Sequence, residues 1–328
     1  MAWRQRWSLP YQTLVPGAIA VGLVGLLRGL GLLTGAEWAT LDSFWRGRWP
    51  ENLEARVVVV RITEEDLRRY GYPLPDGVLA TALTKLQAQN PRGIGVDIFR
   101  DLPVGTGGDR LAVLWQDERI VAIEKSVLPD PENSRVKPPP GVLPHQVGFA
   151  DVLPDRDGRV RRALLSAPGL DGDYRFSLAM RLVERYLYAE GVTLTNGLRD
   201  PQAFRFGTVE VPRFRGDWGG YVREDDGGNQ ILVPWPRLPV QSGDMRFPSM
   251  TLHQLLSGAG PPVTDRLVLL GYAAAASAKD TLQVPAVSTT EIYGVEYHAL
   301  VIAHLLGMAL DGRPPLRAFP GWLSYLWL

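Results

Sequence analysis

The chain has 328 residues, and its 35 basic residues balance 35 acidic ones. This balance excludes a general nucleic-acid binder, which needs a basic surface to displace counterions from phosphates, so we expect no nucleic-acid partner. The chain contains no cysteine, which excludes disulfides, thiolate metal sites and cysteine nucleophiles. The stretch of about 280 residues between its apolar ends is long enough to bury a large core.

The N-terminus carries an apolar segment over residues 14–33, interrupted by Arg28 and preceded by a short basic head. About 20 apolar residues cross a bilayer as a helix, and a charge near one end can reach the headgroups. Residues 34–37 do not form a small-residue cleavage site, so we expect a retained transmembrane helix with a cytoplasmic N-terminus. A second apolar stretch, 319–328, predicts the start of another membrane helix.

Between these ends, the first half of the chain alternates short Val/Ile-rich runs with segments of leucine at helical spacing. An amphipathic helix over 38–50, ended by Pro50, comes first. The elements expected after it are strand 56–63, helix 75–89, strand 93–99, helix 109–116 and strand 120–124. This alternation is typical of βαβ units, and it predicts an α/β fold with a mainly parallel sheet and helices on both faces.

The second half predicts antiparallel additions to that sheet. It begins with a proline-rich surface excursion over 129–144. The elements expected after it are two strands within 149–165 joined by a turn at 155–158, helix 176–189, loops and hairpin strands over 195–228, strand 231–235, helix 249–257 capped by Ser249, strand 266–271 and helix 295–309.

Several long blocks of sequence carry a resemblance to a known family. The blocks are ITEEDLRRYGYPLP (62–75), PRGIGVDIFRDLP (91–103), GFADVLPDRDGRVRR (148–162), LVLLGYAAAASAKDTLQVPA (267–286) and GVEYHALVIAHLL (294–306). In this order they resemble the CHASE2 family, the second type of the cyclase and histidine-kinase associated sensory extracellular domains. The resemblance implies a bacterial sensory module in the inner membrane, outside the cytoplasm, which relays a signal to a cytoplasmic cyclase or kinase.

This resemblance and the apolar ends together predict the domain organisation. Residues 1–37 would be a cytoplasmic head and the N-terminal transmembrane helix, 38–315 the extracytoplasmic sensory domain, and 316–328 the start of a second transmembrane helix. Because the family plan places an output domain further along, we expect a fragment or a truncated gene. The expected partners are an unidentified small ligand or an envelope protein, and a second copy of the chain. We expect neither catalytic residues nor a cofactor.

Acidic side chains follow two of the predicted strands. Glu64 and Asp66 come after the first strand, and Asp97 lies in the second. Open parallel sheets bind ligands beyond the carboxyl ends of their strands, near a topological switch point. These carboxylates are therefore candidates for binding a metal, a cationic ligand or an amine. In the alternative interpretation, Glu64 and Asp66 cap the next helix and Asp97 accepts hydrogen bonds from backbone amides.

The loop at 271–278 and the residues after it supply further candidates. Its small residues let backbone amides approach an anion, with Ser277 and Asp280 as ligand-binding residues, or let the loop pack against the sheet. Together with Lys279 these residues leave open an envelope hydrolase, although the chain has no G-x-S-x-G motif. A periplasmic scaffold without a small ligand is the third function that stays open.

Glu296 and His298, at the start of the last predicted helix, complete the candidate ligand-binding set. His298 could bind a metal or sense pH; in the alternative interpretation it is a half-buried histidine at the helix start, bonded to a neighbouring loop. We expect no metal site. The chain lacks an H-E-x-x-H motif, and the turn at Asp155 and Asp157 has no glutamate at the twelfth position of a calcium loop.

Overall fold

The computed structural model describes residues 9–47, 54–125, 127, 135–236, 247–274, 281–285 and 291–324. The chain forms two compact units. The larger unit comprises Trp45–Arg213 and Gly227–Leu316, and the smaller unit comprises Met1–Phe44, Phe214–Asp226 and Arg317–Leu328.

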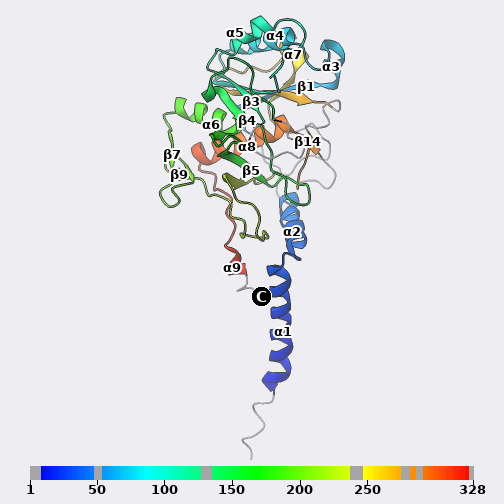
Figure 1. Ribbon diagram of the computed structural model, residues 1–328, viewed down its shortest axis with the longest axis vertical. Coiled ribbons are helices and arrows are strands. Elements are labelled where there is room, and N and C mark those ends of the chain that lie inside the picture. Colours follow the sequence, from blue (N-terminus) through cyan, green and yellow to red (C-terminus); the bar gives the residue numbers. More distant parts are fainter. Residues whose placement is uncertain are drawn as a thin grey trace, which may run out of the picture. The chain divides into compact units, whose positions relative to one another are not determined.

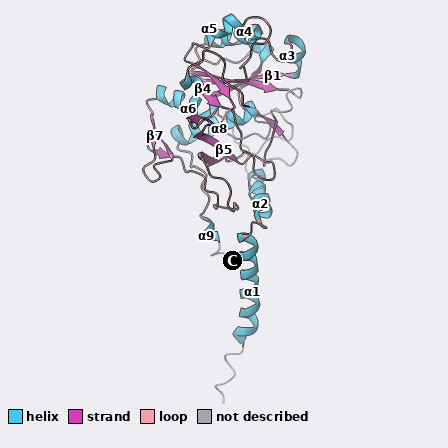
Figure 2. Ribbon diagram, in the orientation of Figure 1, coloured by secondary structure: helices cyan, strands magenta, loops and turns pink. Residues whose placement is uncertain are grey.

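The larger unit is built on a six-stranded sheet of order β11-β1-β12-β2-β3-β4, in which all neighbouring strands are parallel (Figures 1 and 2). The strands are β1 (Val57–Thr63), β2 (Gly93–Asp97), β3 (Ile120–Glu124), β4 (Val147–Phe149), β11 (Ser249–Thr251) and β12 (Leu267–Ala273). The four valines of β1 are all buried, as expected of a strand covered on both faces. The predicted parallel sheet is thus confirmed.

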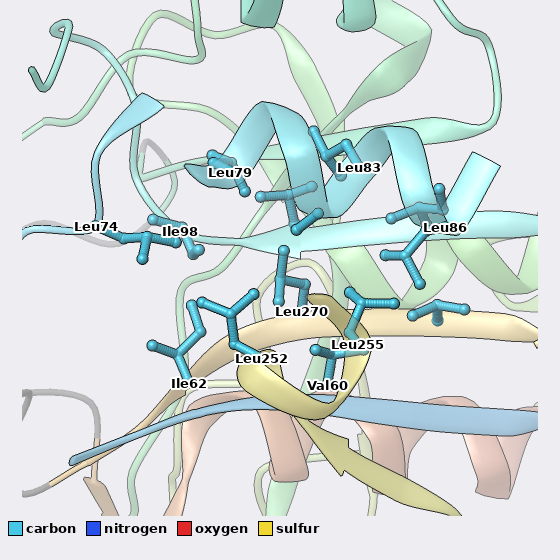
Figure 3. Packing of buried hydrophobic residues seen from close by; sticks show 14 of the residues in the cluster. Val60, Ile62, Leu74, Leu79, Leu83, Leu86, Ile98, Leu252, Leu255 and Leu270 are labelled. Atoms are coloured by element: carbon cyan, nitrogen blue, oxygen red, sulfur yellow. The ribbon is translucent and has the colours of Figure 1, made fainter. Parts of the chain in front are cut away.

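Helices cover both faces of this sheet, as predicted. One face carries α4 (Asp76–Gln87), α5 (Gly108–Leu114) and α7 (Leu252–Ser257), and the other carries α6 (Leu178–Ala189) and α8 (Gly294–Leu310) (Figure 1). Leu79, Leu83 and Leu86 lie at helical spacing on α4 and point toward the strands in Figure 3. On the opposite face, a side chain at Gly95 would collide with leucines of α6, so glycine lets that helix approach closely.

Three crossovers of the sheet run the same way, and the connection from β4 to β11 returns to the opposite edge. β1 leads to β2 through α4, β2 to β3 through α5, and β11 to β12 through α7. Each step moves toward the β4 edge with its helix on the same face, which is the arrangement that right-handed crossovers produce. Among the described elements, however, β12 leads into α8 on the other face, so the connections after β12 and after its neighbours β1 and β2 leave the sheet toward opposite faces. A switch point of the predicted kind therefore lies beside Asp97.

Short antiparallel sheets complete the larger unit and confirm the predicted additions. β5 (Arg162–Pro168) pairs with β6 (Tyr174–Phe176) and β10 (Asn229–Leu232). The other strands are β7 (Leu194–Asn196), β8 (Phe204–Phe206) and β9 (Val209–Glu210) in one sheet, and β13 (Thr281–Gln283) and β14 (Glu291–Tyr293) in another. A single 3-10 turn, η1 (Pro144–Gln146), precedes β4.

Two element predictions are wrong. The strands expected within 149–165 do not pair with each other, because β4 joins the parallel sheet next to β3 and β5 pairs with β10 and β6. The helix expected over 249–257 begins only at Leu252, since residues 249–251 form β11. Its cap is Thr251 instead of Ser249: the Thr251 hydroxyl accepts from the amide of Gln254, whose side chain bonds back to residue 251.

The smaller unit contains α1 (Leu9–Gly29), most of α2 (Thr34–Gly47) and α9 (Gly321–Ser324). Over the described ranges, no single helix is long and apolar enough to span a bilayer. Residues 14–29 and 34–47 satisfy that test only as a pair, which is bent by 85°. The predicted helix over 14–33 thus ends earlier, at Gly29, and the predicted end at Pro50 lies outside the described residues. Of the apolar face expected for the helix over 38–50, Trp38 is buried but Phe44 is exposed.

The loop 214–226 holds together the three segments of the smaller unit. Arg28 donates to the carbonyl oxygen of Gly219 at 2.8 Å and pairs with Glu37 on α2. The Gly219 amide donates to the carbonyl oxygen of Phe319 at 3.0 Å. Trp38 packs on Tyr221, with ring centroids 5.2 Å apart. The segments preceding and following the larger unit are therefore joined to one loop.

Candidate functional site

Asp66 is a structural cap at the start of α3 (Glu64–Tyr70). Its Oδ2 accepts from the Thr63 amide at 2.9 Å and from the Thr63 hydroxyl at 2.8 Å, and its Oδ1 accepts from the His253 amide at 2.9 Å. The carboxylate thus closes a capping box on α3 and also binds the start of α7. The capping interpretation is confirmed for Asp66, which has little accepting capacity left for a ligand.

We expect Asp66→Ala to lower the free energy of unfolding by about 1–2 kcal/mol, because the amides of Thr63, the N-cap of α3, and of His253 lose their acceptor. Urea denaturation of the full chain followed by tryptophan fluorescence measures this loss. Glu65→Ala, at the exposed neighbouring position, is the control and should change stability by less than about 0.5 kcal/mol. Equal effects of the two changes would contradict the capping role.

Asp97 and His298 meet beneath the start of α8. Asp97 ends β2, and His298 lies in the second turn of α8, with its Nε2 3.9 Å from Asp97 Oδ1. The two side chains are 12% and 4% exposed. Within the described part of the chain, neither side chain makes a hydrogen bond, so the predicted backbone bonds of Asp97 and loop bond of His298 are not formed there. His298 is buried and Asp97 is half-buried, and polar groups at such positions usually have hydrogen-bond partners.

Gly271 of β12 lets α8 come close to Asp97. It pairs with Asp97 across the sheet, and a Cβ at this position would lie 2.8 Å from Val295 Cβ and 3.2 Å from Asp97 Cβ. The first distance is shorter than real carbon contacts, so any side chain would push α8 outward. The glycine therefore sets the spacing between the carboxylate and the helix that carries His298.

Gly271→Ala should lower the free energy of unfolding by about 1–3 kcal/mol, because the added methyl overpacks the contact with α8. Chemical denaturation of the full chain measures the change. Gly108→Ala is a matched control: its Cβ would meet only Asp76 Oδ2, at an ordinary 3.5 Å. If Gly271→Ala were as stable as that control, the close approach of α8 would be disproved.

Glu296 on α8 and Arg61 on β1 are charged residues that interact with each other near Gly271. Glu296 is buried in the first turn of α8, where its Oε2 accepts from the Tyr293 amide at 3.2 Å. Arg61, on β1, lies on the far side of Gly271 and donates to the Ser249 hydroxyl. Burial raises the pKa of Glu296, and the nearby positive charge of Arg61 opposes that rise. The positive charge of Arg61 thus favours the ionised form of Glu296.

Burial moves the pKa values of Asp97 and His298 in opposite directions. Desolvation of the carboxylate raises the pKa of Asp97 to about 7. Desolvation of the imidazolium lowers the pKa of His298 to about 4. Between about pH 4 and pH 7 the Asp97 carboxyl is protonated and His298 is neutral. Above about pH 7 the site has an ionised Asp97 carboxylate beside a neutral imidazole. Both groups can then accept hydrogen bonds.

The acidic and basic residues of the block at 148–162 form a buried ion network. Asp155 Oδ2 lies 2.9 Å from Arg161 Nη1, and Asp155 Oδ1 lies 2.8 Å from Arg162 Nε. Asp157 accepts from Arg161, and Gln230 of β10 accepts from Arg162. Both arginine side chains are almost fully buried. The turn that superficially resembled a calcium loop is thus occupied by guanidinium groups.

The same block is bonded to the segments that build the site. The Tyr297 hydroxyl on α8 donates to the carbonyl oxygen of Arg162 at 3.3 Å, and the Val160 amide donates to the carbonyl oxygen of Gln283 on β13 at 2.9 Å. The position of α8, and hence of His298, therefore depends on contacts with the block at 148–162.

The structure brings together Asp97 and His298 from the predicted set, and Glu296 lies two residues before His298 on α8. Glu64 is the half-buried first residue of α3. The loop candidates lie outside the described residues: Ser277, Lys279 and Asp280. The described ranges contain no group of three or more His, Cys, Asp or Glu residues able to hold a metal ion. Arg61 was missed, although an arginine inside a run of valines was a visible signal. Gly271, predicted to begin the loop at 271–278, lies within β12.

Comparison with models of protein families matches residues 19–328 to the family described as CHASE2 domain. No curated protein and no solved structure matches the chain. The matched range includes all the sequence blocks that carried the resemblance, so the predicted membership of the CHASE2 family is confirmed.

Proposed function

The chain belongs to the CHASE2 domain family, a family of extracellular sensory domains, and from this membership we propose that it is the signal-receiving part of a bacterial transmembrane receptor. The larger unit would lie outside the cytoplasm, anchored in the inner membrane by the apolar segments at both ends. It would relay its signal to a cytoplasmic cyclase or kinase. The family is sensory and not catalytic, which favours this role over an envelope hydrolase.

The observation that best supports ligand recognition by this chain is the Asp97–His298 pair, a half-buried carboxylate beside a buried imidazole. Its side chains make no hydrogen bonds within the described residues, and they lie between the sheet and α8. A ligand that bonds to both would favour one position of α8. A shift of populations by a factor of ten needs a difference in binding free energy of only about 1.4 kcal/mol between two arrangements.

The loop 214–226 is the segment through which a signal could pass to the two apolar segments. The chain leaves the larger unit after Arg213 and returns to it at Gly227. Within the loop, Gly219 bonds to Arg28 of the N-terminal segment and to Phe319 of the C-terminal segment. A change that moved this loop would act on both flanking segments together. A symmetric dimer is the expected unit, because two copies can convert such a shift into altered output.

Protease added to intact cells that express the full chain tests the proposed sidedness. With the outer membrane permeabilised, the larger unit should be digested while a cytoplasmic control protein stays intact. Protection of the larger unit under these conditions would overturn the receptor role. A periplasmic scaffold would also be digested, so thermal denaturation of the chain with a panel of metabolites follows. Stabilisation by a metabolite supports a sensor, and its absence supports a scaffold.

Ser277→Ala separates the sensor from the hydrolase. A hydrolase that uses this hydroxyl would lose turnover of ester and amide substrates. A sensor should show no such turnover in either protein. Hydrolysis by the unmodified chain that disappears in the variant would favour the enzyme.

A further inference from the structure

The spacing of Asp97 and His298 suits one hydrogen-bonding atom placed between them. A distance of 3.9 Å separates Oδ1 from Nε2, which is too long for a direct hydrogen bond. An atom about 2.9 Å from each acceptor would see them at an angle of about 85°. This angle is close enough to tetrahedral for one nitrogen or oxygen atom to donate to both.

Because one of the two acceptors is a carboxylate, a cation is favoured as that donor. Arg61 acts on Glu296, across Gly271 from Asp97, and donates to Ser249 on the other side. On α8, Tyr297 donates its hydroxyl to the carbonyl oxygen of Arg162, so it does not supply a proton to Asp97. The two acceptors of the pair are therefore the Asp97 carboxylate and the neutral His298 imidazole.

We propose that the Asp97–His298 pair is a binding site for a small primary amine, whose ammonium group donates one hydrogen bond to Asp97 Oδ1 and another to His298 Nε2. This inference names the ligand class of the proposed sensory site and rests on that function only for its biological meaning. Hydrogen bonds between an ammonium group and a carboxylate are charge-assisted and therefore stronger than those between neutral groups. Because a quaternary ammonium has no N–H group, it cannot replace the primary amine here.

The site also predicts a dependence of amine affinity on pH. The ammonium binds the ionised carboxylate, so at low pH the amine must displace a proton from Asp97, whose pKa burial raises to about 7. The apparent affinity should therefore weaken by about 100-fold from pH 8 to pH 5. Near pH 6, each bound amine should release close to one proton.

Calorimetric titration of the full chain in detergent with methylammonium chloride tests the proposal. We expect saturable binding at pH 8, weaker binding at pH 5, and no binding of tetramethylammonium chloride. Repeating the titration near pH 6 in two buffers of different ionisation enthalpy measures the released proton. Absence of saturable methylammonium binding at pH 8, or equal binding of both cations, would overturn the proposal and leave a bridging water as the occupant.

Asp97→Asn and His298→Gln should each weaken methylammonium binding by about tenfold or more. Glu65→Gln, on the exposed surface of α3, should leave it unchanged. The proton-release measurement needs no variant, so it decides the matter even if a substitution prevents folding. Amine binding by a chain whose larger unit is protected from protease would refute the receptor role alone. Digestion without amine binding would refute only the ligand class.

Discussion

Asp97→Asn should make the free energy of unfolding rise with pH by about 2 kcal/mol between pH 5 and pH 8. In this variant His298 remains buried, with its pKa lowered by desolvation from 6.5 to about 4. At pH 5 the unfolded chain protonates this histidine while the folded chain does not, so acid favours unfolding. This penalty disappears above the unfolded pKa of 6.5, and stability increases accordingly.

His298→Gln should show the opposite slope, with stability falling by about 3 kcal/mol over the same range. Here Asp97 remains, and desolvation raises its pKa from 3.8 to about 7. The folded chain keeps this proton at pH 5 and the unfolded chain does not, so acid favours folding. The contribution is lost as the pH rises through 7. In the unmodified chain the two effects nearly cancel.

Urea denaturation of the three proteins at pH 5 and pH 8 measures these slopes. Glu296 and the other titrating groups are common to all three, so the differences from the unmodified chain isolate the pair. Slopes of the same sign in both variants would show that Asp97 and His298 are not buried together. Two flat profiles would show that both side chains are hydrated.

The sequence predicted the parallel sheet well because its signals are local. The four valines of β1 and the leucine spacing of α4 identify a buried strand and an amphipathic helix without any knowledge of neighbours. The prediction failed where pairing decides the structure. Residues 249–251 are too short to signal a strand, and they form β11 because Pro248 and the next residues run alongside β1. A local cap pattern cannot reveal such a partner.

The site was predicted in its residue types but not in its arrangement. In the sequence, Asp66, Asp97 and His298 look alike, because each is a polar residue near the end of a predicted strand or the start of a predicted helix. Only the fold separates them: Asp66 is satisfied by the backbones of α3 and α7, whereas Asp97 meets His298 from more than 200 positions away in the chain. That contact depends on Gly271 admitting α8, which no spacing along the sequence reveals.

Asp155→Asn should be among the most destabilising single changes in the larger unit, at about 3–5 kcal/mol. The Asp155 carboxylate contacts both Arg161 and Arg162, and all three side chains are at most 1% exposed. Asparagine keeps the shape but removes the charge, so two buried guanidinium groups lose the carboxylate that lies between them. Breaking a buried ion pair from one side is costly because the remaining charge has no access to water.

Asp157→Asn is the matched control, because Asp157 also pairs with Arg161 but its side chain is 37% exposed. Water and salt screen this pair, so its loss should cost no more than about 1 kcal/mol. The comparison uses the same substitution, two positions apart, and the same denaturation measurement. Equal losses would mean that other groups compensate the two arginines. The Asp and Arg residues of the block at 148–162 would then need a role in binding instead of folding. A large difference assigns them to holding the turn against β5, and with it the helix that carries His298.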